Sequence, residues 1–159
     1  RSTSNVSVRK TRFHAPADDQ GIIRLSNIIL CRDSVLTARN EATENPFSLQ
    51  DPLQVEGASV LPDMSGIYRK SLDKELVVFF VADTRQISAQ MQATLEFVAD
   101  GTPQLKLQRI LPAPDAAGRI RFVARVALDP LKPGKYELRV TASDGNGSAY
   151  GTAQFRVER

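Results

Sequence analysis

Residues 131–147 read LKPGKYELRVTASDGNG, and residues 148–157 continue as SAYGTAQFRV. From Tyr136 onward the apolar side chains fall on every second residue, a period of two that is typical of a strand with one buried face. Residues 144–147 tolerate positive φ, and the alternation then resumes through Ala149, Phe155 and Val157. The stretch therefore predicts a hairpin of two strands, with one side buried beneath a second layer that includes residues 120–128.

Further short extended segments precede this hairpin. We expect strands over the ranges 58–62, 66–69, 75–82, 104–108 and 119–128. Residues 75–82 are apolar on both parities, so both faces need cover: one from the core, the other from residues 21–50 or a partner domain. Residues 87–99 fit helical as well as strand spacing. We predict a strand from Gln92, because Asp100-Gly101 is a hairpin turn signal.

These patterns predict an all-β fold, an antiparallel immunoglobulin-like β-sandwich of about seven to eight strands with an N-terminal extended arm. We assign residues 1–20 to a linker or the end of a preceding domain, 21–52 to an extended arm and loop that pack on the sandwich, and 53–159 to the sandwich itself. Residues 31–52 are polar and broken by prolines, so we expect a long connection with little regular structure. The chain begins at Arg1 without methionine, and we interpret it as a piece of something longer.

Composition narrows the class of protein. A hydrophobic content of 42% and a charged content of 25% are typical of a globular chain, and no apolar run approaches the ~20 residues of a membrane helix. The net charge of +3 comes with arginines spread along the whole chain, so we expect no nucleic-acid binding. The single Cys31 excludes an internal disulfide and is expected to be a small buried or half-buried residue.

Few side chains in the sequence could carry out a reaction. With one histidine, His14, and one cysteine, the chain offers no second candidate for a catalytic triad, so we expect no enzyme, no cofactor and no metal site. Paired carboxylates such as Asp18-Asp19, or Asp73 with Glu75, fall at expected turns and strand ends. Asp144-Gly145-Asn146-Gly147 resembles the start of a calcium loop, but Phe155 stands where the closing carboxylate would be.

Two groups of residues are candidates for surface contacts. Tyr68 and Tyr150 are the aromatics that could stack on a sugar. Arg119, Arg121 and Arg125 alternate with apolar residues along one expected strand, and form either an anion contact or a solubilising, edge-protecting row.

Residues 131–144 resemble the penultimate strand of bacterial immunoglobulin-like and fibronectin type III-like domains. In those domains a tyrosine after a Pro-Gly turn anchors the corner through its hydroxyl, and the resemblance implies that role for Tyr136. Leu138 occupies the position of the antibody disulfide cysteine, and the chain has no tryptophan, so the resemblance is to the wider fold rather than to antibody domains.

A closer resemblance is to the C-terminal region of acidobacterial-type von Willebrand factor A-related proteins. It rests on residues 6–9, similar to the last strand of the preceding A domain, on residues 25–30, and on the ending Phe155-Arg156-Val157. The resemblance implies a bacterial chain in an extracytoplasmic location, whether periplasmic, cell-surface or secreted. We expect a non-catalytic module acting as spacer or protein-interaction domain, whose partners are neighbouring domains or another protein. The alternative is a carbohydrate-binding accessory module with a glycan as partner.

Overall fold

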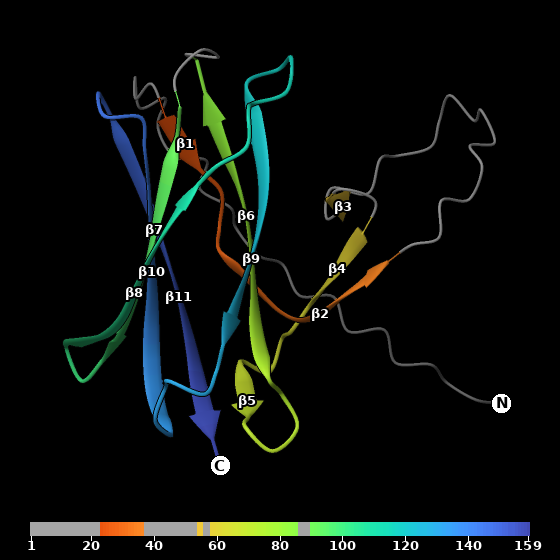
Figure 1. Ribbon diagram of the computed structural model, residues 1–159, viewed down its shortest axis with the longest axis vertical. Helices are drawn as coiled ribbons and strands as arrows, with labels where there is room; N and C mark the ends of the chain where they lie inside the picture. Colours follow the sequence, from red (N-terminus) through yellow and green to blue (C-terminus); the bar gives the residue numbers. More distant parts are fainter. Residues whose placement is uncertain (1–22, 37–53, 56–57, 86–89) are drawn as a thin grey trace, which may run out of the picture.

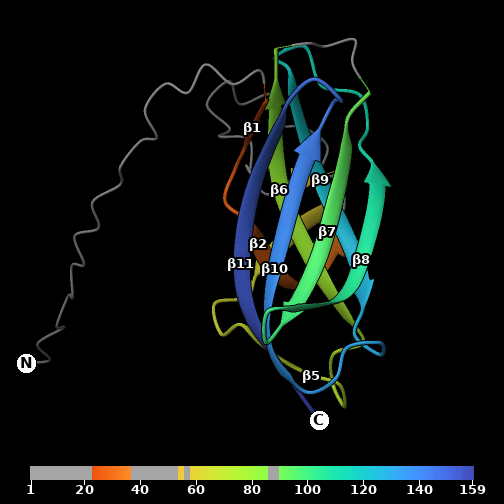
Figure 2. The same ribbon diagram turned by 90° about the vertical axis from the view of Figure 1, so that its left-hand side faces the viewer.

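The computed structural model describes residues 23–36, 54–55, 58–85 and 90–159 (Figure 1). These residues form eleven strands and no helix, which confirms the expected all-β class. The strands make two sheets that are antiparallel except at one pair and lie face to face as a sandwich (Figures 1 and 2).

The first sheet, the β10 sheet, contains the predicted hairpin. Its spatial order is β5 (Ile67–Arg69), β11 (Ser148–Glu158), β10 (Gly134–Ser143), β7 (Gln92–Ala99) and β8 (Thr102–Ile110). β10 and β11 pair without a break from Gly134↔Val157 to Ser143↔Ser148. β7 and β8 turn through Asp100 and Gly101, both at positive φ, so the predicted strand from Gln92 and its Asp-Gly turn are confirmed.

The second sheet, the β6 sheet, is organised around β6 (Glu75–Thr84). β9 (Arg119–Ala127) pairs with β6 along one edge, while β1 (Ile23–Leu25) and β2 (Ile29–Leu36) share the other. β2 continues to β4 (Ala58–Pro62), which pairs with β3 (Gln54–Val55). The N-terminal segment therefore supplies strands to this sheet. The expectation of irregular chain from Cys31 is wrong for residues 31–36, because pairing with the distant β4 makes this polar segment part of a strand.

An irregularity in the ladder separates β1 from β2. Leu25 lies opposite Ala82 and Ile29 opposite Phe79, so the β1–β2 segment carries one more residue than β6. Ser26 bridges the gap: its N–H donates to the Val81 carbonyl (2.8 Å), and its Oγ accepts from the Val81 N–H (2.9 Å). The serine hydroxyl thus replaces the backbone acceptor that the bulge removes.

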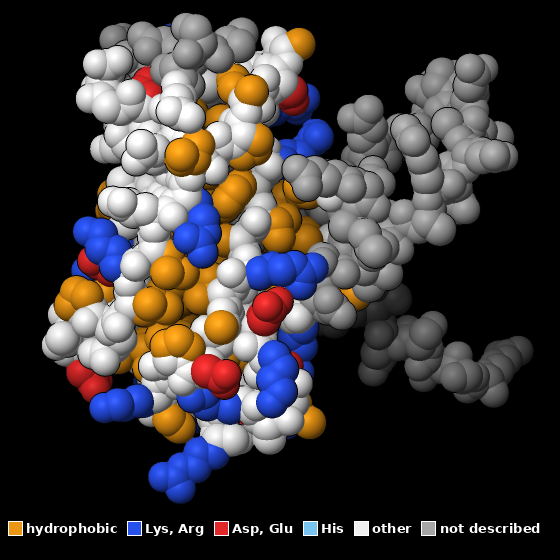
Figure 3. Space-filling view, in the orientation of Figure 1, with side chains coloured by type: hydrophobic (Ala, Val, Ile, Leu, Met, Phe, Trp, Pro, Cys, Tyr) orange, Lys and Arg blue, Asp and Glu red, His pale blue; other side chains and the backbone are white. Residues whose placement is uncertain are grey.

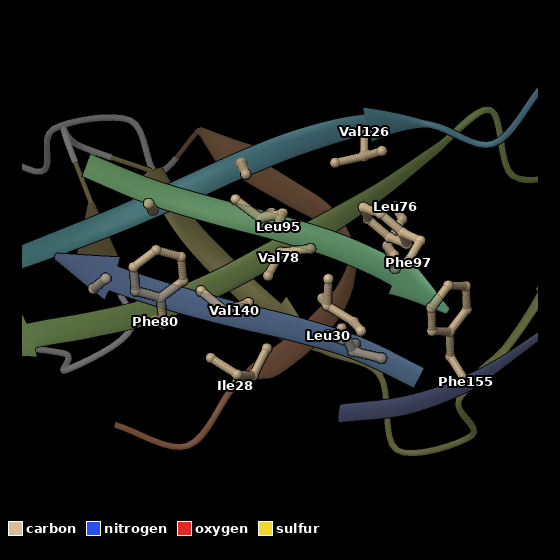
Figure 4. Close-up of a cluster of buried hydrophobic side chains, with 14 of the residues drawn as sticks. Ile28, Leu30, Leu76, Val78, Phe80, Leu95, Phe97, Val126, Val140 and Phe155 are labelled. Carbon is tan, nitrogen blue, oxygen red and sulfur yellow. The ribbon is translucent and has the colours of Figure 1, made fainter. Parts of the chain in front are cut away.

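The main core lies between the two sheets. Leu76, Val78 and Phe80 of β6 face Leu95 and Phe97 of β7 and Val140 of β10 across the sandwich (Figure 4). The hairpin buries one side beneath the layer that contains β9, as predicted, through Tyr136, Leu138, Val140, Ala142, Phe155 and Val157. Alternate residues of β10 and β11 point to solvent, which is why these strands show the period of two so clearly.

A smaller apolar cluster covers the outer face of the β6 sheet. Val77 and Phe79, on the outward parity of β6, are almost fully buried with Cys31 of β2 and Val60 of β4. Val55 of β3 packs against the same cluster. The β2–β4–β3 part of the sheet therefore gives β6 the second cover that its sequence requires, and Ile29 and Cys31 of the N-terminal segment contribute to it.

Candidate functional site

Tyr136 lies at the start of β10, directly after the Pro133-Gly134 turn. Its hydroxyl donates to the Lys132 carbonyl at 2.8 Å. The ring is 4% exposed and stacks on Phe155, with ring centroids 5.3 Å apart and planes 20° apart. One side chain therefore joins the turn to the core through a hydrogen bond at one end and apolar packing at the other.

Tyr68 is fully buried, so the expectation that it lies on the surface is wrong. Its ring meets Phe155 edge to face at 6.0 Å, and its hydroxyl lies 3.5 Å from the Cys31 carbonyl oxygen. Burial first, then the charge of Asp63, raises the pKa of Tyr68 well above its usual value. The physical reason is the position of β5: pairing beside β11 turns the middle residue of this short strand inward.

Tyr150 is 78% exposed on β11. It is the single aromatic among the exposed large apolar side chains of the described residues. A sugar platform built from Tyr68 and Tyr150 together therefore does not form, because the two rings lie in different environments.

The predicted arginine row is present on the outward parity of β9. Arg119 pairs with Asp115 and Arg125 with Glu75, each at 3.4 Å, and these four side chains are 40–49% exposed. Exposed ion pairs of this kind contribute about 0–1 kcal/mol each to the stability of the fold, and their charges stay accessible to a ligand. Arg121, between them, is half-buried and borders a groove described below.

An open pocket of about 520 Å³ lies on the outer face of the β10 sheet. Lys135, Arg139 and Arg156 line it together with Asp100 and Glu137. Glu137 hydrogen-bonds and pairs with Arg139, which raises the pKa of that guanidinium further. Lys135 and Arg156 lie directly opposite each other in the ladder. Sequence reasoning missed this group because the register that joins the basic residues is set by pairing; the polar parity of each strand was the available signal.

Three carboxylates serve turns. Asp63 accepts from the Ser65 N–H, Asp115 from Ala117 and Arg119, and Asp144 from Asn146 and Gly147, at 2.8–3.0 Å. Burial opposes ionisation of Asp63, but hydrogen bonds from Ser65 and the nearby Arg32 outweigh it and lower its pKa. Within the described ranges no group of three His, Cys, Asp or Glu could hold a metal ion. His14, Asp18 and Asp19 lie outside these ranges.

Cys31 is fully buried, as expected, beneath the outer cluster. Burial, with a smaller contribution from Asp63, raises the pKa of its thiol to about 11. The thiolate, which is the nucleophilic form, is therefore scarce near neutral pH.

No family model and no curated protein match this chain. Among the described residues, no helix is long and apolar enough to cross a membrane.

Proposed function

We propose that this chain is a non-catalytic immunoglobulin-like module of an exported multidomain protein, acting as a spacer or protein–protein interaction domain. The observation that carries the proposal is the strand arrangement together with Tyr136. β7, β10 and β11 oppose the antiparallel pair β6 and β9, as strands C, F and G oppose B and E in immunoglobulin-like sandwiches. Tyr136 bonds back to Lys132 at the start of the strand that would be F.

The chemistry of the described surface supports a binding role over a catalytic one. The carboxylates of Asp63, Asp115 and Asp144 are engaged by backbone N–H groups, and the Cys31 thiol is buried. The alternative, a carbohydrate-binding module, needs two or three exposed aromatics in one plane, and Tyr150 alone meets that requirement among the described residues.

The parent protein and its location rest on resemblance. Residues 6–9, 25–30 and 155–157 support a place after a von Willebrand factor A-related domain, and with it an extracytoplasmic location. Labelling of intact source cells with a membrane-impermeant amine reagent tests the location. Modification of the chain supports export, and protection until the cells are lysed contradicts it.

Cross-linking of the full natural protein tests the interaction role. Lys106 and Lys135 lie on different strands, β8 and β10, and provide reactive amines there. Cross-links from either lysine to a neighbouring domain or another protein are expected if the module is a spacer or binding unit. Cross-links confined to this chain, together with substrate turnover by the purified chain, would contradict the proposal.

A further inference from the structure

The sandwich has one open side, along which β8 and β9 lie, one in each sheet (Figure 2). Each is the last strand of its sheet there, since among the described residues β8 pairs with β7 alone and β9 with β6 alone. Away from this side, the segment that contains β1 packs close to β11: a Cβ added to Gly151 would lie 3.2 Å from the Cγ1 atom of Ile28. The open side therefore combines two strand edges.

The backbone of β9 directs a regular row of hydrogen-bonding groups away from β6. Thr84 N–H donates to the Gly118 carbonyl at 2.8 Å, and Leu128 N–H donates to the Lys74 carbonyl at 3.0 Å. Because hydrogen-bonded pairs alternate along an antiparallel ladder, Arg119, Arg121, Val123 and Arg125 direct their N–H and C=O groups outward. The N–H and C=O groups of Arg119 already exchange hydrogen bonds with Asp115, at 3.0 and 2.9 Å. An added strand would find its donors and acceptors at Arg121 and Val123, in the middle of β9.

β8 offers a second edge, and one of its outward acceptors is likewise occupied. The same alternation, started from the bond between Leu111 N–H and the Met91 carbonyl, places Gln108 among the outward residues of β8. Its carbonyl already accepts from the Arg109 guanidinium at 3.0 Å. The neighbouring side chain thus occupies an acceptor that an added strand would need.

A groove of about 500 Å³ adjoins the outward row of β9. Its lining combines residues 121–123 of β9, the end of β8 and Val55 of β3. Ile110, at the end of β8, is 63% exposed, and Phe122 is half-buried. Figure 3 shows apolar side chains along this side of the molecule with Lys and Arg side chains around them.

The stretch of chain that contains β8 and β9 is mostly basic. Between Thr102 and Leu128 the chain has five basic residues and one acidic residue, a net charge of +4, whereas the whole chain carries +3. The members are Lys106, Arg109, Arg119, Arg121 and Arg125, with Asp115 as the acidic residue. Arg119 and Arg125 are paired with the carboxylates of Asp115 and Glu75, and Lys106 belongs to the other sheet. The charge of the two edge strands together is still positive, which favours an acidic partner.

We propose that the edge of β9 at Arg121 and Val123, with the adjoining groove, binds an extended segment of a partner protein with alternating acidic and apolar side chains, added as a strand beside β9. Acidic and apolar side chains are expected to alternate because successive side chains of a strand point to opposite faces. Side chains of one parity would lie beside Arg121 and Arg125, and those of the other would face Phe122 and Ile110. This inference rests on the proposed interaction function and names its partner class and surface.

Fluorescence anisotropy with the full chain tests the proposal. The probe is a labelled synthetic peptide of about eight residues alternating Glu with Val, compared with a peptide of the same composition whose glutamates are grouped at one end. The alternating peptide is expected to bind at least about tenfold more tightly than the grouped one. Equal binding of both would overturn strand addition in favour of simple charge attraction.

A matched pair of variants locates the site. Arg121→Glu is expected to weaken binding of the alternating peptide by about tenfold or more, because it places a carboxylate beside the peptide's own. Lys135→Glu makes the same charge change on the outer face of the β10 sheet and is expected to alter affinity by less than about twofold. Ile110→Ser, at an exposed position, is expected to weaken binding without reversing charge. Equal effects of Arg121→Glu and Lys135→Glu would contradict the site.

Amide hydrogen exchange identifies the mode of binding. The amides of Arg121 and Val123 are expected to exchange rapidly in the free chain and to gain protection with the peptide. Protection already present in the free chain would overturn the proposal, since another segment or a second copy would then cover the edge. Loss of the peptide site would leave the general interaction function standing, because cross-links from Lys135, on the outer face of the β10 sheet, test that function separately.

Discussion

Replacing Gly118 with alanine is expected to lower the free energy of unfolding by about 2–5 kcal/mol. Gly118 has φ of +78°, a left-handed conformation that costs an L-residue about 1–2 kcal/mol. A Cβ there would also lie 2.3 Å from the Thr84 carbonyl oxygen. The Thr84 N–H is bonded to the Gly118 carbonyl, so relief requires separating β6 from β9, at a further cost of about 1–3 kcal/mol.

Gly145→Ala is the matched control. Gly145 has φ of +89°, but no heavy atom lies within 4 Å of the added Cβ, so only the conformational cost of about 1–2 kcal/mol is expected. Urea unfolding followed by circular dichroism measures both variants, with stability compared at constant m. Equal losses for the two glycines, or a loss under about 1 kcal/mol for Gly118→Ala, would refute the close contact between Gly118 and Thr84.

Three further outcomes follow from the contacts described above. Tyr136→Phe is expected to lower the free energy of unfolding in urea by about 1–2 kcal/mol, because it removes the donor to the Lys132 carbonyl while keeping the ring. An unchanged free energy of unfolding would show that the hydroxyl does not stabilise the corner. Phe79→Ala is expected to cost about 3–5 kcal/mol although Phe79 is on the outward parity of β6, and a surface-like loss under about 0.5 kcal/mol would show that the outer cluster is not packed. The folded state lowers the pKa of Asp63, so the ionised carboxylate stabilises the fold above the ordinary carboxyl pKa of about 4, and this stability is lost as the pH falls through the lowered value. Asp63→Asn is therefore expected to cost about 1–2 kcal/mol at pH ~7 and less in acid. A cost that does not change with pH would contradict this assignment.

Local pattern was sufficient for the strands whose two faces differ. β10 and β11 bury one face and expose the other to solvent, so apolar and polar residues alternate visibly in residues 134–157 without knowledge of the partner sheet. The Asp100-Gly101 turn likewise determined a strand rather than a helix over residues 92–99, because a two-residue turn at positive φ requires a strand on each side. The arginine row on β9 was predictable for the same reason.

The pairing of strands that are far apart in the chain could not be predicted from the local pattern of apolar and polar residues. Cys31 to Leu36 read as polar loop, yet they extend β2 because β4, far along the chain, provides the ladder. Tyr68 read as a surface aromatic, and its inward direction depends on the parallel pairing of β5 with β11. The second cover of β6 was required by its sequence, but which segments supply it was left open.

The amino-acid sequence alone thus determined that this chain is built from extended segments, where its hairpins turn, and which residues of the long strands are buried, since alternation and turn chemistry act between near neighbours. Only the tertiary structure decided which strands pair, that Tyr68 is interior, and that Arg121 and the outward backbone of β9 adjoin the groove at Phe122. The physical reason is that register and edge position depend on contacts between residues far apart in the chain, which leave no periodic signal in either partner.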